Sequence, residues 1–248
     1  MERPELTAIP EPLHPSMQAL TTALDLGLGT QLQGITVVGS CLTPDFQPGS
    51  SDINTVLMVD RIDRSVLEGI GKAVRPLARK HHLAAPLLMT ATYVERSRDV
   101  FGIEWLDFQL SHQTVLGNDP FVDMSFAKPD VRLQCEREFK ADLIRLRQGY
   151  ITAAGSNRIL REVITAAIKS LGPKLRALLW LHDVTREPTL EATLHQASQT
   201  LNLDFETLLP VTQWQKTKPS TSQLHEAYDR LYGFVDQLAT RVDALEVA

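Results

Sequence analysis

Gly39, Ser40 and Asp52 have the residue types and the spacing of a site for phosphate and a divalent metal. Gly39-Ser40 follows the β-branched run of residues 35–38, and Asp52 opens a second strand-like run. A glycine after a buried strand lets backbone approach a ligand closely, and the N–H groups that follow can surround phosphate oxygens. A nearby carboxylate could hold Mg²⁺, which prefers oxygen ligands and usually also contacts substrate phosphates. The stretch therefore predicts a phosphate-and-metal site.

Asn54 stands two residues after Asp52, so on a strand both side chains point to the same face of the sheet. Ser51 precedes them, and its hydroxyl is a further candidate contact for a nucleotide. The alternative is structural, because serine and aspartate readily cap a turn and Gly-Ser after a strand is commonly just a turn. Both interpretations stay open at this point.

A second acidic stretch, residues 101–110, is predicted to be a strand with Glu104 and Asp107 inside an otherwise apolar run. The odd spacing of these two acids puts them on opposite faces of a regular strand, so only one can face the site. An unpaired acid turned into the core is costly, so the other should face solvent or a partner.

The pattern of residues 39–54 resembles the signature of the nucleotidyltransferase superfamily, the fold of kanamycin nucleotidyltransferase and DNA polymerase beta. It consists of Gly39-Ser40, eleven further residues and then Asp52-Ile53-Asn54. The acidic run at 101–110 is similar to the later strand that supplies that family's third carboxylate. The segment from 133 to 150 resembles the helical half of bacterial nucleotidyltransferase-domain proteins.

The resemblance implies Mg²⁺-dependent transfer of a nucleotidyl group from an NTP to an unidentified small-molecule or protein acceptor. In that mechanism acids hold metals that neutralise phosphate charge and activate the attacking hydroxyl. Gly39 and Ser40 would bind the triphosphate, and Asp52 would be a metal ligand. Glu104 or Asp107 would be a ligand or the general base. The Ile-Glu start of this run resembles the catalytic-base strand of streptomycin-type adenylyltransferases, which favours Glu104 as the second metal ligand.

Two departures from the family pattern support an alternative. Asn54 stands where the family usually has its second acid, and one neutral carbonyl oxygen should hold two Mg²⁺ ions less well. The loop after Gly39-Ser40 also lacks the arginine common in active relatives. The alternative hypothesis is a catalytically impaired protein on the same fold, which binds a nucleotide or a protein partner.

Lys140 and Arg147 are the candidate basic contacts for a nucleotide outside the turn. On a helix with 3.6 residues per turn they lie on one flank of the apolar stripe, where they could border a cleft and meet phosphates. The alternative is a solvated helix face on which Glu136 and Asp142 pair with them.

Helical and strand periodicities predict the domain organisation. Strands are expected at 35–38, 53–59 and 87–90, with helices from 16 and from 63 to 80 and a helical turn at 92–96. After residue 129 only helical spacing recurs, with breaks at Gly172 and Pro188. We therefore predict an α+β or α/β, nucleotidyltransferase-like domain with a mixed sheet flanked by helices (1–128), followed by an all-α helical bundle (129–248).

The composition restricts which classes of partner and which location we expect. The chain has 248 residues, 43% hydrophobic and 22% charged, and a net charge of −5, which gives no sign of general attraction to nucleic acid or membrane surfaces. Two cysteines are too few for a disulfide framework. Because no apolar run approaches about 20 residues and no secretory signal is visible, a cytoplasmic location is expected. A homodimer stays open.

Overall fold

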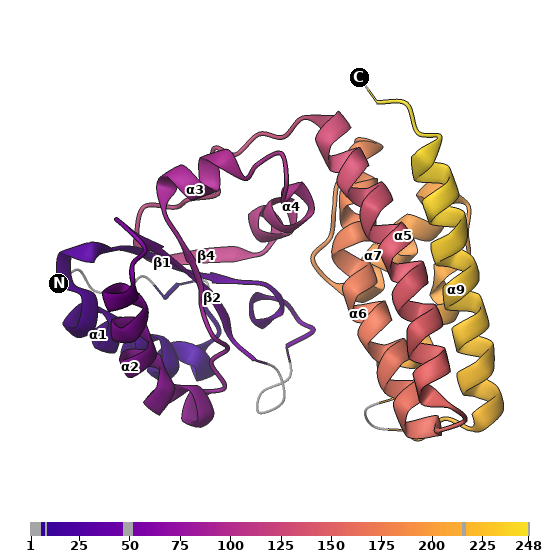
Figure 1. The fold of residues 1–248 in the computed structure, drawn as a ribbon, viewed down its shortest axis with the longest axis horizontal. Helices are drawn as coiled ribbons and strands as arrows, with labels where there is room; N and C mark the ends of the chain where they lie inside the picture. The colour runs from indigo at the N-terminus through magenta and orange to yellow at the C-terminus, as the bar shows by residue number, and fades with distance from the viewer. Residues whose placement is uncertain (1–5, 8, 47–51, 215–216, 248) are drawn as a thin grey trace. The chain divides into compact units, whose positions relative to one another are not determined.

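The computed structural model describes residues 6–7, 9–46, 52–214 and 217–247. The chain divides into two compact units. The sheet unit comprises residues 1–98 and 107–125, and the helical unit comprises residues 99–106 and 126–248. Figure 1 shows the first mainly in indigo to magenta and the second mainly in rose to yellow. A short segment ahead of the main boundary thus belongs with the C-terminal helices.

The sheet unit contains a four-stranded mixed sheet in the order β3-β2-β1-β4. Its strands are β1 (Leu32–Val38), β2 (Asn54–Val59), β3 (Leu87–Met89) and β4 (His112–Gly117). β1 pairs antiparallel with β2 and β4, whereas β2 and β3 are parallel. The helices of this unit are α1 (His14–Leu28), α2 (Arg64–His81) and α3 (Ala91–Arg96). The expected fold class, a mixed sheet flanked by helices with further helices after it, is confirmed.

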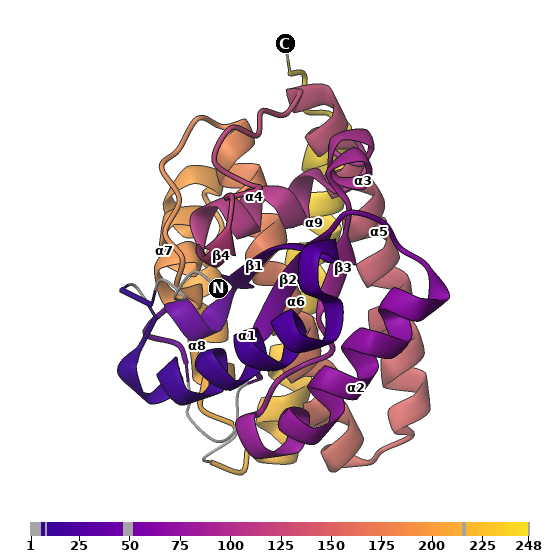
Figure 2. The same cartoon turned by 90° about the vertical axis from the view of Figure 1, so that its left-hand side faces the viewer.

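One face of this sheet packs on α1 and α2, which lie side by side (Figure 2). Alternate residues of the strands, such as Ile35, Val37 and Leu57, share one buried cluster with apolar residues of both helices. α2 begins where the Asp63 side chain accepts the Val66 N–H at 3.0 Å. Because the two central strands are buried on this face, their register is strongly fixed.

The predicted strand at 101–110 is wrong: these residues form the helix α4 (Gly102–Leu110). β4 follows it and was not predicted from the sequence. Glu104 and Asp107 therefore lie on a helix, where residues three apart are neighbours on the same side rather than on opposite faces.

Contacts with α5 (Lys128–Ala153) explain why this run is helical. Gly102 packs so closely that a Cβ would lie 2.8 Å from a Val131 methyl carbon. The Gln134 side-chain oxygen accepts the Ile103 N–H at 2.9 Å, which satisfies a donor in the first turn of α4. Ile103 and Leu106, three residues apart, are buried in the same cluster as α5. Packing against α5 thus overrides the strand propensity of a short apolar run.

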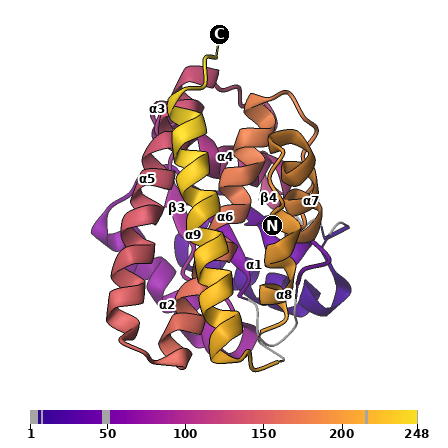
Figure 3. The same cartoon turned by 90° about the vertical axis from the view of Figure 1, so that its right-hand side faces the viewer.

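The helical unit is built mainly from four helices, seen in Figure 3. They are α5, α6 (Asn157–Leu181), α7 (Leu190–Leu201) and α9 (Thr221–Asp243). A 3₁₀ turn, η4 (Phe205–Leu208), and the short α8 (Leu209–Thr212) connect the last two. α5 packs against α6 and α9, and α6 packs against α7. None of the helices in the described ranges is long and apolar enough to cross a membrane.

The predicted break at Gly172 is wrong, because α6 runs without interruption through Gly172 and Pro173. An interior proline costs a helix about 3 kcal/mol. Leu171 and Leu175, on either side of this point, are fully buried. Burial of the surrounding turns offsets the local cost and keeps the helix continuous.

Candidate nucleotide site

The turn after β1 is shaped by Gly39. Its φ of 83° and ψ of −153° lie in a region that is essentially restricted to glycine. Its N–H donates to the Ser111 carbonyl at 2.9 Å, and its carbonyl accepts the Leu42 N–H at 3.1 Å. The chain then enters the 3₁₀ turn η3 (Ser40–Leu42). This turn, hereafter the Gly39 turn (residues 39–42), has no side chain at its first position, so a ligand can approach its backbone.

Cys41 fastens the Gly39 turn to the sheet. Its side chain is 1% exposed, and its Sγ lies 3.7 Å from the Val38 carbonyl oxygen. Burial raises the pKa of the thiol to about 11, although the backbone N–H of Asn54 on β2 partly opposes this shift. The thiol is therefore neutral near pH 7 and acts as a packing group beneath the turn.

Asp52 and Asn54 lie beside this turn. Between them, Ile53 is buried, donates its N–H to the His82 carbonyl at 2.7 Å and accepts the Ala84 N–H at 3.1 Å. The flanking Asp52 and Asn54 are exposed, since successive side chains of extended chain point to opposite faces. Asn54 also pairs in register with the residue just before Gly39. Ser51 lies outside the described residues.

The donor set suits one Mg²⁺ ion. The carboxylate of Asp52 and the amide oxygen of Asn54 are exposed oxygen ligands on one face, and Mg²⁺ commonly binds one or two such groups together with waters and substrate phosphates. Within the ranges that the structure describes, no three His, Cys, Asp or Glu side chains gather as a metal site. The oxygen donors of Asp52 and Asn54 fit Mg²⁺ in type, and binding of the ion stays a prediction.

β3, the outer neighbour of β2 in the sheet, supplies no third carboxylate. Its Leu87 pairs with Val56, which puts Leu87 on the same face as Asn54. Leu87 is 45% exposed, a position where an acid could have reached the site. Glu104 instead accepts the Gln134 side-chain amide at 2.7 Å within the helical unit. Neither Glu104 nor Asp107 lies on a strand beside the site, and their roles stay predictions.

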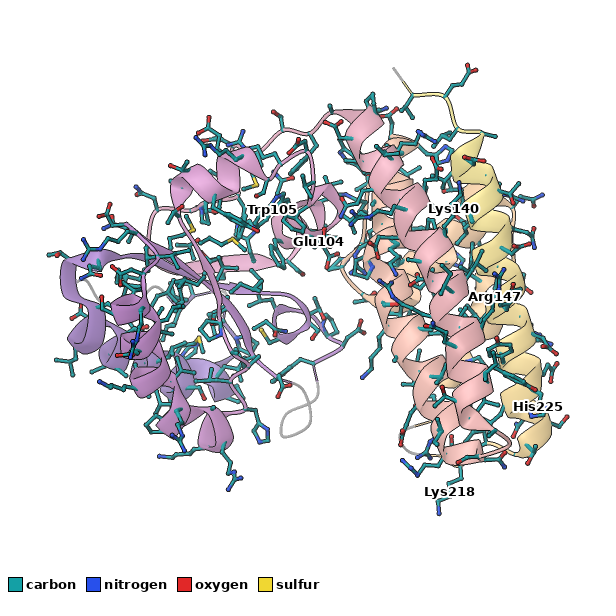
Figure 4. All side chains as sticks on the ribbon, viewed as in Figure 1. Glu104, Trp105, Lys140, Arg147, Lys218 and His225 are labelled. Carbon is teal, nitrogen blue, oxygen red and sulfur yellow. The ribbon has the colours of Figure 1, made fainter. Side chains whose placement is uncertain are left out.

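Lys140 and Arg147 both contact α9 (Figure 4). Lys140 lies 2.6 Å from Glu136 and 3.3 Å from Asp243, and hydrogen bonds to these two carboxylates raise its pKa. Arg147 donates to the Tyr232 hydroxyl at 2.8 Å, and its guanidinium lies 5.6 Å from that ring's centre. Contact with a nucleotide stays a prediction for both, and it would require them to leave or share these partners.

The alternative pairing was half right. Glu136 does pair with Lys140, whereas Asp142 pairs elsewhere. Asp142 is buried and binds the ammonium of Lys174 on α6, and it also accepts from Arg145 at 2.9 Å.

His112 is the residue near the turn that sequence reasoning missed. It begins β4 and pairs in register with Val38, on the side opposite Asn54. Its Nδ1 lies 2.8 Å from the Phe108 carbonyl oxygen and its Nε2 lies 2.8 Å from the Asp119 carboxylate. The available signal in the sequence was Asp119, an acid in a polar turn seven residues after His112. Only the pairing of β4 with β1 places His112 beside Gly39.

No protein-family model matches the sequence, and no curated protein matches it. Among solved structures, the chain is similar to a spectinomycin adenyltransferase from Enterococcus faecialis, described with ATP and spectinomycin. The TM-score is 0.56 at 12% identity, and the match covers 90% of this chain and 99% of that chain. At this identity the likeness shows the nucleotidyltransferase fold, and function must be argued from the site.

Proposed function

We propose that the protein binds a nucleoside triphosphate with Mg²⁺ at the Gly39 turn and transfers the nucleotidyl group to a small-molecule acceptor. The observation that carries the proposal is the placement of the Gly39 turn and Asp52 at the same end of two neighbouring strands in a nucleotidyltransferase fold. ATP is the first donor to test, because the similar adenyltransferase was solved with ATP and a small molecule. A protein acceptor and a homodimer remain further predictions.

Each residue of the site has a defined task in this proposal. The missing side chain of Gly39 lets the triphosphate reach the backbone, and Ser40 offers a hydroxyl donor. Asp52 and Asn54 supply oxygen ligands for the metal. Bound Mg²⁺ would neutralise phosphate charge. The buried Ile53 and Cys41 hold these groups in place from below.

Label transfer tests the proposal. The protein is incubated with each α-labelled NTP, Mg²⁺ and a panel of hydroxyl-bearing small molecules, and labelled products are separated. We expect Mg²⁺-dependent transfer that Asp52→Ala lowers by at least about 100-fold, the scale for loss of an essential electrostatic group. Asp60→Ala is the matched control, since this exposed aspartate follows the other end of β2. Transfer that survives Asp52→Ala would contradict the assignment of the site.

A second candidate is nucleotide binding without transfer. Two features favour it: Asn54 stands where the family resemblance implies an acid, and Leu87 occupies the exposed position on β3. Calorimetry with ATP, with and without Mg²⁺, separates the candidates. Binding that needs no metal, together with no labelled product, supports the second. Absence of binding to every NTP refutes both and leaves protein interaction as the use of the fold.

A further inference from the structure

Ser111 is the single residue between α4 and β4, and it controls the peptide of Gly39. Its N–H donates to the carbonyls of Asp107 at 3.2 Å and Phe108 at 3.1 Å, at the end of α4. Its own carbonyl accepts the Gly39 N–H at 2.9 Å. Because one residue makes both connections, any movement of β4 relative to the end of α4 is passed to the Gly39 turn.

His112 locks this junction. Its ring lies between the Phe108 carbonyl and the Asp119 carboxylate, each 2.8 Å from a ring nitrogen. A carbonyl and an ionised carboxylate can only accept hydrogen bonds, so both bonds form together only when both ring nitrogens carry protons. A positive charge is also favourable at the C-terminal end of a helix, where Phe108 lies. His112 thus bridges the end of α4 to Asp119, which lies just after β4.

The surroundings restrict this ring further. The second carboxylate oxygen of Asp119 accepts the Phe121 N–H at 2.8 Å, which fixes the direction of the carboxylate. Phe121 is fully buried, and its ring stands edge-on to His112, with 5.3 Å between ring centres. The His112 side chain is only 16% exposed. Asp119 is the charged group that contacts the ring in these bonds.

We propose that His112 is a positioning residue of the nucleotide site. By clamping the end of α4 to the start of β4, it holds Ser111 where its carbonyl fixes the Gly39 peptide. His112 and Asn54 pair with the same residue, Val38, from opposite sides, so the clamp lies across β1 from the proposed metal ligand. The proposal rests on the proposed function, because it assigns His112 to nucleotide binding at that same turn.

The variant His112→Gln tests the clamp. Its neutral amide cannot make a charge-assisted hydrogen bond to the Asp119 carboxylate while also bonding the Phe108 carbonyl. Amide hydrogen exchange at Gly39 is followed by NMR in the nucleotide-free protein, and the Kd for ATP with Mg²⁺ is measured by calorimetry under conditions where the variant stays folded. We expect protection at Gly39 to fall and the Kd to rise, each roughly tenfold, the size expected for one lost charge-assisted hydrogen bond. In the wild type, ¹⁵N signals should show protons on both ring nitrogens.

The matched control is His14→Gln. His14 lies in the same unit, and its Nε2 is 2.8 Å from the Ile9 carbonyl oxygen, which belongs neither to β4 nor to residues 39–42. This variant should change stability while the Kd and the exchange at Gly39 stay as in the wild type. Asp119→Asn keeps one acceptor but loses the charge. Its Kd for ATP and its exchange rate at Gly39 should lie between those of the wild type and those of His112→Gln. It replaces His112→Gln as the test if that variant does not fold.

Two results overturn the proposal: unchanged exchange at Gly39 in His112→Gln, or faster exchange with an unchanged Kd, which would make the clamp purely structural. A wild-type protein that binds no NTP refutes the proposed function instead. In that case the exchange at Gly39 still reports whether His112 holds the turn, so the two failures are distinguishable.

Discussion

Replacing Gly39 by alanine separates backbone strain from loss of contacts. A Cβ built at Gly39 meets nothing within 4 Å, so the substitution causes no steric clash. Its cost is the backbone conformation itself, with φ of 83° and ψ of −153°. Such conformations cost a non-glycine residue about 1–3 kcal/mol.

The chain can respond to Gly39→Ala in two ways. If the turn keeps its shape, the free energy of unfolding falls by that full amount, and the Tm falls by about 2–4 °C for each kcal/mol. If the turn relaxes instead, less stability is lost but the N–H bond to Ser111 opens. Since the proposed ligand lies against this backbone, we expect the Kd for ATP to rise by about tenfold or more in the second case. Chemical denaturation and calorimetry on the same samples distinguish the two.

Gly155→Ala is the matched control. Gly155 also has a φ of 83° and nothing within 4 Å of a built Cβ, but it lies between α5 and α6 in the helical unit. It should lose stability on the same scale and bind ATP as the wild type does. The reasoning is refuted if Gly39→Ala is neutral in both assays, or if Gly155→Ala weakens ATP binding as much as Gly39→Ala.

Three further predictions follow from the donor set and from the two buried polar features. Asn54→Asp should lower the Mg²⁺ concentration needed for half-maximal ATP binding by about tenfold, because it adds a charged oxygen ligand; no change in a Mg²⁺ titration would exclude residue 54 from the metal. Burial raises the pKa of Cys41 to about 11 and that of Cys135 to about 12, so both thiols should resist alkylation at pH 8 until the protein unfolds. Unfolded thiols ionise near pH 9.0, so the stability that comes from keeping both buried thiols protonated is intact below that pH. It is lost as pH rises through about 11 to 12. Denaturation at pH 8 and at pH 10.5 should therefore give a lower free energy of unfolding at the higher pH. Lys174→Met should cost about 3–5 kcal/mol by leaving Asp142 buried without its main partner, whereas adding Asp142→Leu should restore most of the loss; equal stability of the single and double variants would contradict the pairing.

The sequence was sufficient for the local parts of the site. Gly39 was singled out because a glycine after a buried strand lets backbone approach a ligand closely. Its positive φ shows that this position favours glycine, and its role in binding stays a prediction. Asp52 and Asn54 were placed on one face by strand alternation alone, and the exposure of both agrees with it. The helix α2 and the helical character of the chain after residue 129 were predicted for a similar reason, since the apolar spacing repeats over many residues.

Residues 101–110 show where local pattern fails. A short apolar run suits a strand or a buried helix equally, and periodicity alone cannot choose between them. Here Gly102 and Gln134 decided the outcome through contacts with α5, which lies further along the chain. The same packing carried Glu104 and Asp107 away from the expected third strand.

By itself, therefore, the sequence determined the glycine turn after the first strand, the acid near it and the division into a sheet-containing and a helical part, because these depend on neighbouring residues. Only the tertiary structure decided that β4 lies beside β1 and that His112, held by Asp119, stands next to Gly39. It also decided that Lys140 has carboxylate partners on α5 and α9. Each of these depends on strand pairing or helix packing between distant segments, which no short-range pattern encodes.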